Sequence, residues 1–202
     1  MPFSSHTTPE DPTPSTPVPN RHWGSTVLWL APVLFLAVVV IYGLLTKSST
    51  STPDSGPQMG QPLADFALST LQGQSVQLSA LRGTVVFINV WATWCQPCVD
   101  EMPTIQRLYE SLHTRGLRVV TISVDTLGAQ VVAPFMQKYH LTFPVLLDPQ
   151  GAIERLYRTR GVPESFIVDK HGRLVEKVIG PRDWAHPQML AMFERLLAAP
   201  AP

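Results

Sequence analysis

The strongest constraint on the fold is a pair of cysteines placed between a buried strand and a helix. Cys95 and Cys98 are the only cysteines of the chain, and they stand in the motif Trp-Cys-Gln-Pro-Cys at residues 94–98. The preceding residues 84–91 (TVVFINVW) read as a buried strand, and a helical pattern follows the motif directly. Two intervening residues fit one helical turn, so the sulfurs can close and reopen a short disulfide. A thiol at a helix N-terminus after a tight loop has the geometry of a reactive thiolate.

The pair can also be interpreted as a structural disulfide or as half of a metal site. Zinc normally takes four ligands, yet the sequence holds no second cysteine pair, and its six histidines are scattered singly. We therefore expect redox catalysis, no bound metal, and no cofactor other than a redox-active Cys95–Cys98 disulfide.

An uncharged apolar run at residues 27–45 suggests a membrane span. As a helix it would be about 28 Å long, close to the thickness of the hydrocarbon core. A cleavable signal peptide is the alternative, but its apolar region is shorter and no clear Ala-x-Ala site follows. The flanking charges (Arg21 before, Lys47 after) nearly balance and do not orient the helix. Because membrane-tethered dithiols usually serve an oxidising exterior, we predict that the N-terminus lies inside and the large domain outside.

Composition divides the chain into four parts. Residues 1–25, rich in Pro, Ser and Thr, are predicted to be a disordered tail, and residues 26–46 an uncleaved single-pass anchor. Residues 47–61 are predicted to be a flexible linker, and residues 62–198 one folded domain. The chain carries 15 basic and 15 acidic residues, which gives no indication of a nucleic-acid partner.

The folded domain alternates between strand and helix patterns. Strands are predicted at residues 65–68, 75–78, 84–91, 117–124, 144–147, 165–168 and 173–179, and helices at 97–112, 129–139, 152–157 and 184–197. A β-α-β-α half followed by a β-β-α half predicts a three-layer α/β/α sandwich with a mixed central sheet and an added N-terminal β-hairpin.

This order of elements resembles the thioredoxin fold, and the motifs resemble the membrane-anchored TlpA/ResA/CcmG (DsbE)-like thioredoxin family. The resemblance covers about residues 60–197 and rests on four linked segments, at residues 78–83, 89–98, 101–103 and 161–169. It implies a protein-disulfide oxidoreductase of the bacterial inner membrane, with its N-terminus cytoplasmic and its catalytic domain periplasmic. Cys95 would attack the substrate disulfide, and Cys98 would resolve the mixed disulfide.

Two polar residues near the motif carry further expectations. Glu101 lies three residues after Cys98 on the same helix face, where a carboxylate can accept the Cys98 proton and raise the pKa of that thiol. An ordinary helix acid is the alternative, and the resemblance favours the catalytic role. Asn89 stands where cytosolic thioredoxins carry a buried acid. Because an amide cannot shuttle a proton, Glu101 becomes the nearest candidate, and Asn89 is otherwise a polar group bonded inside the sheet layer.

The segment Gly-Val-Pro-Glu at residues 161–164 is the second part of the expected site. The local sequence alone favours a trans peptide before Pro163. The resemblance instead implies a cis proline facing the disulfide, with the exposed backbone of Val162 pairing with a substrate strand. Glu164 either contacts a partner or tunes the site, or it is a plain surface acid.

The side chains around the thiols complete the expected substrate-binding set. Trp94 is predicted to lie near the surface beside Cys95 as part of a docking patch, while Trp91 packs inward. By resemblance, Gln96 and Pro97 tune the redox potential, which we expect in the reducing range of about −200 to −270 mV.

The predicted function is that of a reductant in cytochrome c maturation. By resemblance to the family, electrons would come from a membrane thiol transporter of the DsbD/CcdA type and pass to oxidised apocytochrome c or a metallochaperone. The alternatives are a general or copper-site-maturing TlpA-like reductase, a copper-binding chaperone and a disulfide-introducing oxidase. A peroxiredoxin is not expected, because Thr93 stands two residues before Cys95 rather than three.

Overall fold

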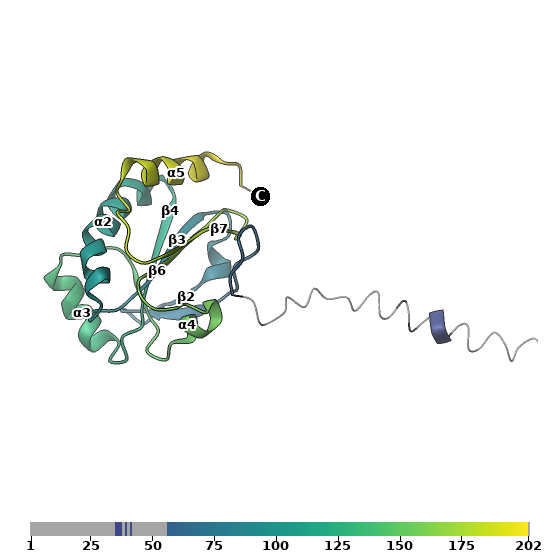
Figure 1. Cartoon of the computed structure of the whole chain (residues 1–202), viewed down its shortest axis with the longest axis horizontal. Coiled ribbons are helices and arrows are strands. Elements are labelled where there is room, and N and C mark those ends of the chain that lie inside the picture. The colour runs from purple at the N-terminus through teal and green to yellow at the C-terminus, as the bar shows by residue number, and fades with distance from the viewer. Residues whose placement is uncertain (1–34, 38, 40, 42–55, 202) are drawn as a thin grey trace, which may run out of the picture. The chain divides into compact units, whose positions relative to one another are not determined.

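The structure is a computed structural model that describes residues 35–37, 39, 41 and 56–201 (Figure 1). The predicted tail, most of the predicted anchor and the linker up to residue 55 lie outside the described residues. Residues 35–37, 39 and 41 are helical. Within the described ranges, no helix is both long enough and apolar enough to cross a membrane.

Two buried parallel strands form the centre of a seven-stranded mixed sheet. Strand β3 (Val85–Trp91) pairs with β4 (Leu117–Ser123) over its whole length. Strands that are covered on both faces read as near-continuous apolar runs, and such runs at residues 84–91 and 117–124 predicted these two strands.

The remaining strands extend the sheet on both sides of this centre. β5 (Val145–Leu147) pairs in parallel with β4, and β6 (Glu164–Val168) pairs antiparallel with β3. The outer strands are β7 (Leu174–Ile179) beside β6, and the hairpin of β1 (Ala67–Thr70) and β2 (Ser75–Gln77) beside β5. The resulting order is β2-β1-β5-β4-β3-β6-β7.

Helices cover both faces of the sheet, which confirms the predicted thioredoxin-like α/β sandwich. Successive side chains of β3 point to opposite faces. Phe87 and Trp91 pack in a core cluster with helices α2 (Gln96–Leu112), α3 (Ala129–Lys138) and α5 (Pro187–Ala198). Val86 and Ile88 pack in a second cluster with α4 (Ala152–Tyr157) and the 3₁₀ helix η1 (Leu78–Leu81). Figure 1 shows α2, α3 and α5 on one side of the sheet and α4 on the other.

The last helix begins later than predicted, at Pro187 instead of residue 184. The residue before a proline is disfavoured in helical conformation, and His186 is extended, with a ψ of 139°. His186 caps the helix through Nδ1, which accepts the backbone N–H of Gln188 at 3.3 Å. Trp184 therefore lies in the loop between β7 and α5, where its side chain is fully buried.

The N-terminal hairpin is also shifted relative to its prediction, because β1 begins at Ala67 rather than at residue 65. The Asp65 carboxylate accepts hydrogen bonds from the side-chain amide of Gln77 and from the backbone N–H groups of Phe66 and Ser79. These hydrogen bonds lower the pKa of Asp65. Leu78 belongs to η1 rather than to the second strand. Most other elements differ from their predictions by a residue at an end.

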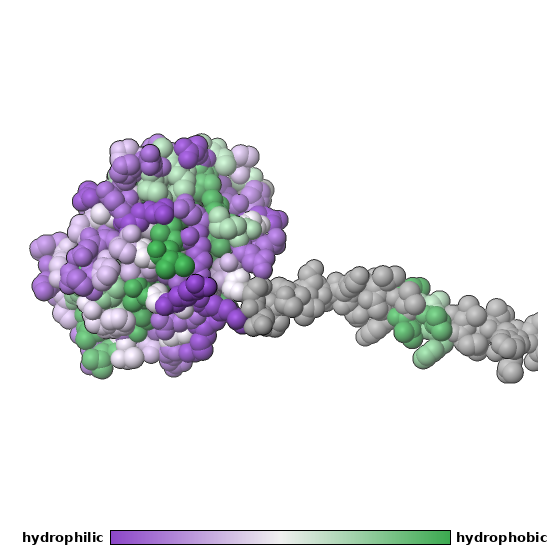
Figure 2. All heavy atoms as spheres, in the orientation of Figure 1, coloured by the Kyte–Doolittle hydropathy of each residue, from purple (hydrophilic) through white to green (hydrophobic). Residues whose placement is uncertain are grey.

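Figure 2 shows that this face of the folded domain is largely polar, with small apolar patches between polar residues. Few large apolar side chains of the domain are well exposed, and Trp94 is the most exposed of them at 71%. A strongly exposed tryptophan in the cysteine motif makes that end of the sheet a candidate contact surface.

Candidate active site

The two cysteines form a disulfide at the first turn of α2. Cys95 is the N-cap residue, and its Sγ accepts the backbone N–H of Cys98 at 3.2 Å. Pro97 lies in the first turn, where no N–H is needed for the helix. Cys95 retains 5% exposure, whereas Cys98 is fully buried. Cys95 is thus the sulfur that a substrate can reach, and the positive end of the helix favours its thiolate.

The loop before β6 lies against the disulfide. The peptide bond between Val162 and Pro163 is cis, which confirms the expectation drawn from the family resemblance. The carbonyl oxygen of Val162 lies 3.5 Å from Sγ of Cys95. Val162 is partly exposed and Pro163 is buried, so the backbone of Val162 borders the accessible sulfur.

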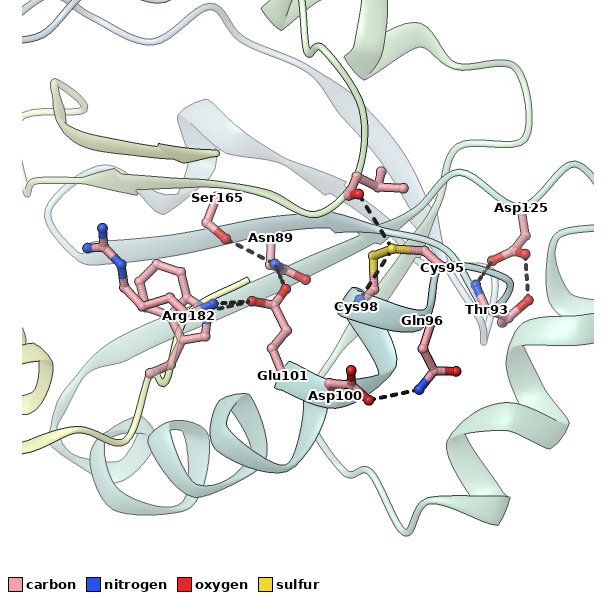
Figure 3. Close-up of a disulfide and its surroundings, with 12 residues drawn as sticks. Asn89, Thr93, Cys95, Gln96, Cys98, Asp100, Glu101, Asp125, Ser165 and Arg182 are labelled. Atoms are coloured by element: carbon pink, nitrogen blue, oxygen red, sulfur yellow. Dashed lines mark hydrogen bonds between the residues drawn. A yellow bond between two sulfur atoms is a disulfide. The ribbon is translucent and has the colours of Figure 1, made fainter. Parts of the chain in front are cut away.

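A buried acid after β4 fixes the loop in front of Cys95. Asp125 is 3% exposed, and its carboxylate accepts the backbone N–H of Thr93 at 2.9 Å and the Thr93 hydroxyl at 2.6 Å. It also accepts the hydroxyl of Ser123 at 2.8 Å. The Thr93 hydroxyl is therefore engaged with Asp125, and the loop that leads to the N-cap is tied to the neighbouring strand (Figure 3).

Glu101 is buried one turn after Cys98, with 2% of its surface exposed. Its Oε1 accepts the side-chain amide of Asn89 at 2.8 Å. Its Oε2 accepts the indole N–H of Trp184 at 3.0 Å and the backbone N–H of Arg182 at 3.2 Å. Figure 3 shows the Glu101 carboxyl group between Asn89 and Arg182.

Burial raises the pKa of Glu101 above its ordinary value of 4.5. The hydrogen bonds from Asn89, Trp184 and Arg182 act in the opposite direction, because N–H donors stabilise the carboxylate. Burial is the larger effect. A carboxyl group with a raised pKa can take up and release a proton nearer to neutral pH than an exposed glutamate can.

Asn89 bonds inside the sheet layer, which agrees with one of the two interpretations of the sequence. Its Nδ2 donates to Glu101 and, at 3.0 Å, to Oγ of Ser165 on β6. Asn89 and Ser165 are directly paired across β3 and β6, and both side chains are fully buried. Asn89 thus links the helix that carries Glu101 to the strand that follows Pro163.

Glu164 is not the surface acid that one interpretation expected, because its side chain is fully buried. Its Oε1 lies 2.5 Å from Nζ of Lys177 on β7, and its Oε2 accepts the backbone N–H of Arg160 at 3.0 Å. A side chain without exposed surface does not touch a partner in this conformation. Glu164 instead ties the loop at residues 160–163 to the end of the sheet.

The other predicted substrate-binding residues surround the disulfide on its exposed side. Trp94 is exposed, as predicted, and Trp91 is fully buried. Gln96 and Pro97 are exposed, and the side-chain amide of Gln96 donates to Asp100 at 2.8 Å. These side chains form the rim of the site rather than its interior.

Several residues of the site were not found by sequence reasoning. The sequence pattern predicts a helix at Trp184, and it gives no role to Arg182, Ser165 or Asp125. The only signal available was indirect: a buried glutamate needs N–H donors, and the sequence does not say which segments supply them.

Comparison with known proteins agrees with this geometry. The sequence model of the AhpC/TSA family matches residues 59–177. The thiol-disulfide oxidoreductase ResA of a Bacillus cereus strain is 37% identical over 123 residues, which cover 61% of this chain and 70% of ResA. The thioredoxin-like protein YneN of Bacillus subtilis (strain 168) is 34% identical over 154 residues, which cover 75% of this chain and 89% of YneN.

Solved structures show the same fold. A Chlorobium tepidum protein described as a thiol:disulfide interchange protein DsbE superimposes with a TM-score of 0.65 at 29% identity, covering 70% of this chain and 99% of that one. The chain belongs to the AhpC/TSA family, and within the thioredoxin fold it is a thiol–disulfide oxidoreductase similar to ResA. The predicted enzyme class is confirmed.

Proposed function

We propose that this protein is a membrane-anchored, extracytoplasmic dithiol reductant that acts in cytochrome c maturation. The observation that carries the proposal is the pairing of an accessible Cys95 at a helix N-cap with a buried Cys98 and a buried Glu101. A nucleophilic thiol that retains some accessible surface and a resolving thiol that is fully buried are the parts that a dithiol reductant needs.

The proposed cycle transfers two electrons from the dithiol to a substrate disulfide. The Cys95 thiolate attacks one substrate sulfur, the substrate S–S bond breaks, and the other substrate sulfur leaves as a thiolate. Cys98 then loses its proton to the Glu101 carboxylate and attacks Sγ of Cys95. The mixed disulfide breaks, the second substrate thiolate leaves, and the Cys95–Cys98 disulfide remains. Glu101 is supported as the proton acceptor because it is buried one helical turn after Cys98 and because its pKa is raised.

The proposed location follows from the sequence. The uncharged run at residues 27–45 would anchor the chain in the inner membrane, with the domain at residues 62–198 in the periplasm. A tether raises the effective concentration of the domain near partners in the same membrane. A thiol transporter of the DsbD/CcdA type is the proposed electron donor, since the disulfide must be reduced again after each cycle.

The proposed substrate is a pair of oxidised cysteines in an extended protein segment, such as the haem-binding cysteines of apocytochrome c. Cys95 and the backbone of Val162 border the same accessible edge. A strand laid along Val162 would bring its sulfur to Cys95.

Two measurements test this proposal. The first is the equilibrium reduction potential of the full-length protein against glutathione. A value near or below those of glutaredoxins supports a reductant, whereas a value near that of DsbA, about −120 mV, contradicts it. The second uses Cys98→Ala, which cannot resolve the mixed disulfide. Trapped apocytochrome c supports the proposed substrate, and trapped metallochaperones alone would favour the copper-site alternative.

A further inference from the structure

Only the nitrogen of the Asn89 side-chain amide forms hydrogen bonds with described residues. Its nitrogen donates to Glu101 and to Ser165. Its oxygen, Oδ1, is buried and has no hydrogen-bond partner within residues 56–201 or the other described positions. Buried carbonyl oxygens without a partner are rare in folded proteins, so this atom calls for an explanation.

The orientation of the amide is set by Glu101. A carboxylate can only accept hydrogen bonds, so the NH₂ end of Asn89 must face it and the oxygen must point elsewhere. Asn89 lies on β3 between Phe87 and Trp91 in the two-residue alternation, and both of these pack in the cluster that contains α2 and Cys98. In Figure 3, the amide of Asn89 lies beside the Glu101 carboxyl group, and its oxygen is on the side of the disulfide.

Cys98 cannot donate a hydrogen bond in the present state. In the disulfide, Sγ of Cys98 carries no proton. Reduction adds two electrons and breaks the S–S bond. Cys98 takes up a proton and becomes a thiol, while Cys95 is released as the thiolate that the helix N-terminus favours or as its protonated form. The new Cys98 thiol is a hydrogen-bond donor. Because Cys98 has no exposed surface, bulk water cannot accept this hydrogen bond.

We propose that the side-chain carbonyl of Asn89 accepts the hydrogen bond of the Cys98 thiol in the reduced protein. Asn89 is then a positioning residue that holds the resolving thiol by its oxygen and Glu101 by its nitrogen. Its link to proton transfer rests on the proposed function of Glu101, whereas the hydrogen bond itself does not.

The proposed hydrogen bond changes the relative stability of the two redox states. The reduced protein gains a hydrogen bond that the oxidised protein lacks, so Asn89 favours the dithiol form. Replacing Asn89 by leucine, which has a similar shape and no polar atoms, should shift the dithiol–disulfide equilibrium with glutathione toward the disulfide by about two- to tenfold.

The direct test is the infrared S–H stretch of Cys98. Cys95→Ala leaves Cys98 as the only thiol of the chain, so a single S–H band is observed. We expect this band at the lower frequency of a hydrogen-bonded thiol, and a move to the frequency of a free thiol when Asn89→Leu is added. Ser165→Ala is the matched control, because it removes a partner of Nδ2 and leaves the carbonyl in place. A band that does not move in Asn89→Leu overturns the proposal.

A second measurement needs no substitution at Asn89. The chain has only two asparagines, Asn20 and Asn89, so selective ¹³C labelling of asparagine yields two side-chain carbonyl signals. On reduction of the full-length protein, the Asn89 signal should move downfield, as it does when a carbonyl accepts a hydrogen bond, while Asn20 serves as internal reference. An unchanged Asn89 signal contradicts the proposal even if Asn89→Leu fails to fold.

These readouts separate the hydrogen bond from the cellular role. If the S–H band and the Asn89 signal respond as expected while Cys98→Ala traps no disulfide-bonded protein, the hydrogen bond stands and the proposed function fails. If the trap succeeds and both spectroscopic signals stay constant, the reverse holds.

Discussion

The indole N–H of Trp184 donates a 3.0 Å hydrogen bond to Glu101, a residue that precedes it by 83 positions. Both side chains are buried, and the Trp184 ring lies 4.5 Å from the Phe87 ring, measured between centroids. The carboxyl group beside the resolving cysteine is therefore held by a loop from the far end of the domain. The pKa of Glu101 and the packing of the β7–α5 loop are coupled through this contact.

Replacing Glu101 by glutamine should change how stability depends on pH. Because the pKa of Glu101 is raised on folding, the folded protein binds more protons than the unfolded chain above pH 4.5. The favourable contribution is fully present below that pH and is lost as pH rises through the raised pKa. The free energy of unfolding of Glu101→Gln, relative to the parent, should therefore increase between pH 4 and pH 8. Urea denaturation at several pH values measures this, and parallel curves would contradict it.

Trp184→Phe should destabilise the protein more than Trp91→Phe does. Both tryptophans are fully buried, but only the Trp184 indole has a hydrogen-bond partner, since Nε1 of Trp91 has none among the described residues. The difference in unfolding free energy should be about 1.5–3 kcal/mol, the contribution of a hydrogen bond to a charged group. The pKa of Glu101 should also rise in Trp184→Phe alone, because a donor that lowers it is lost. Chemical denaturation and an NMR titration of the Glu101 carboxyl carbon give the two values.

Asp125→Ala should alter the reactivity of Cys95, whereas Asp148→Ala should not. Both acids are nearly fully buried and accept backbone N–H groups: Asp125 from Thr93, and Asp148 from Ala152 and Ile153 at the start of α4. We expect each variant to lose about 2–3 kcal/mol of stability. Only Asp125→Ala releases the loop before the N-cap, so only there should alkylation of reduced Cys95 by iodoacetamide become slower. Equal alkylation rates in both variants would show that the Asp125 contact does not orient Cys95.

Replacing Lys177 should cost more stability than replacing Glu164, its partner in the ion pair. Glu164 is fully buried, whereas the Lys177 side chain is 23% exposed and can extend into solvent when it loses its partner. Lys177→Met leaves a buried carboxylate unpaired and should cost about 3 kcal/mol. Glu164→Gln and the double variant Glu164→Gln/Lys177→Met should cost less. Thermal and urea unfolding of the four proteins forms a double-mutant cycle, and a double variant less stable than Lys177→Met would refute this ordering.

How far the sequence predicts the site depends on the range of the contact. Cys95, Pro97, Cys98 and Glu101 lie within two turns of one helix, so their spacing alone placed them together. Glu164 was harder to interpret, because nothing local indicates that a glutamate next to a loop is covered on every side. Its partner Lys177 reaches it across the sheet from β7.

Local patterns in the chain were enough to establish the order of strands and helices, the reactive cysteine motif and the face on which Glu101 lies. Periodicity, caps and short spacings are properties of neighbouring residues, and they can be read without a fold. The folded chain was needed to show which donors surround Glu101, how Asp125 ties down the loop before Cys95, and that Asn89 turns an unpartnered oxygen toward the disulfide. These relationships join segments far apart in the sequence, and they exist because burial removes water and each polar group must then find its partner in whatever the fold places beside it.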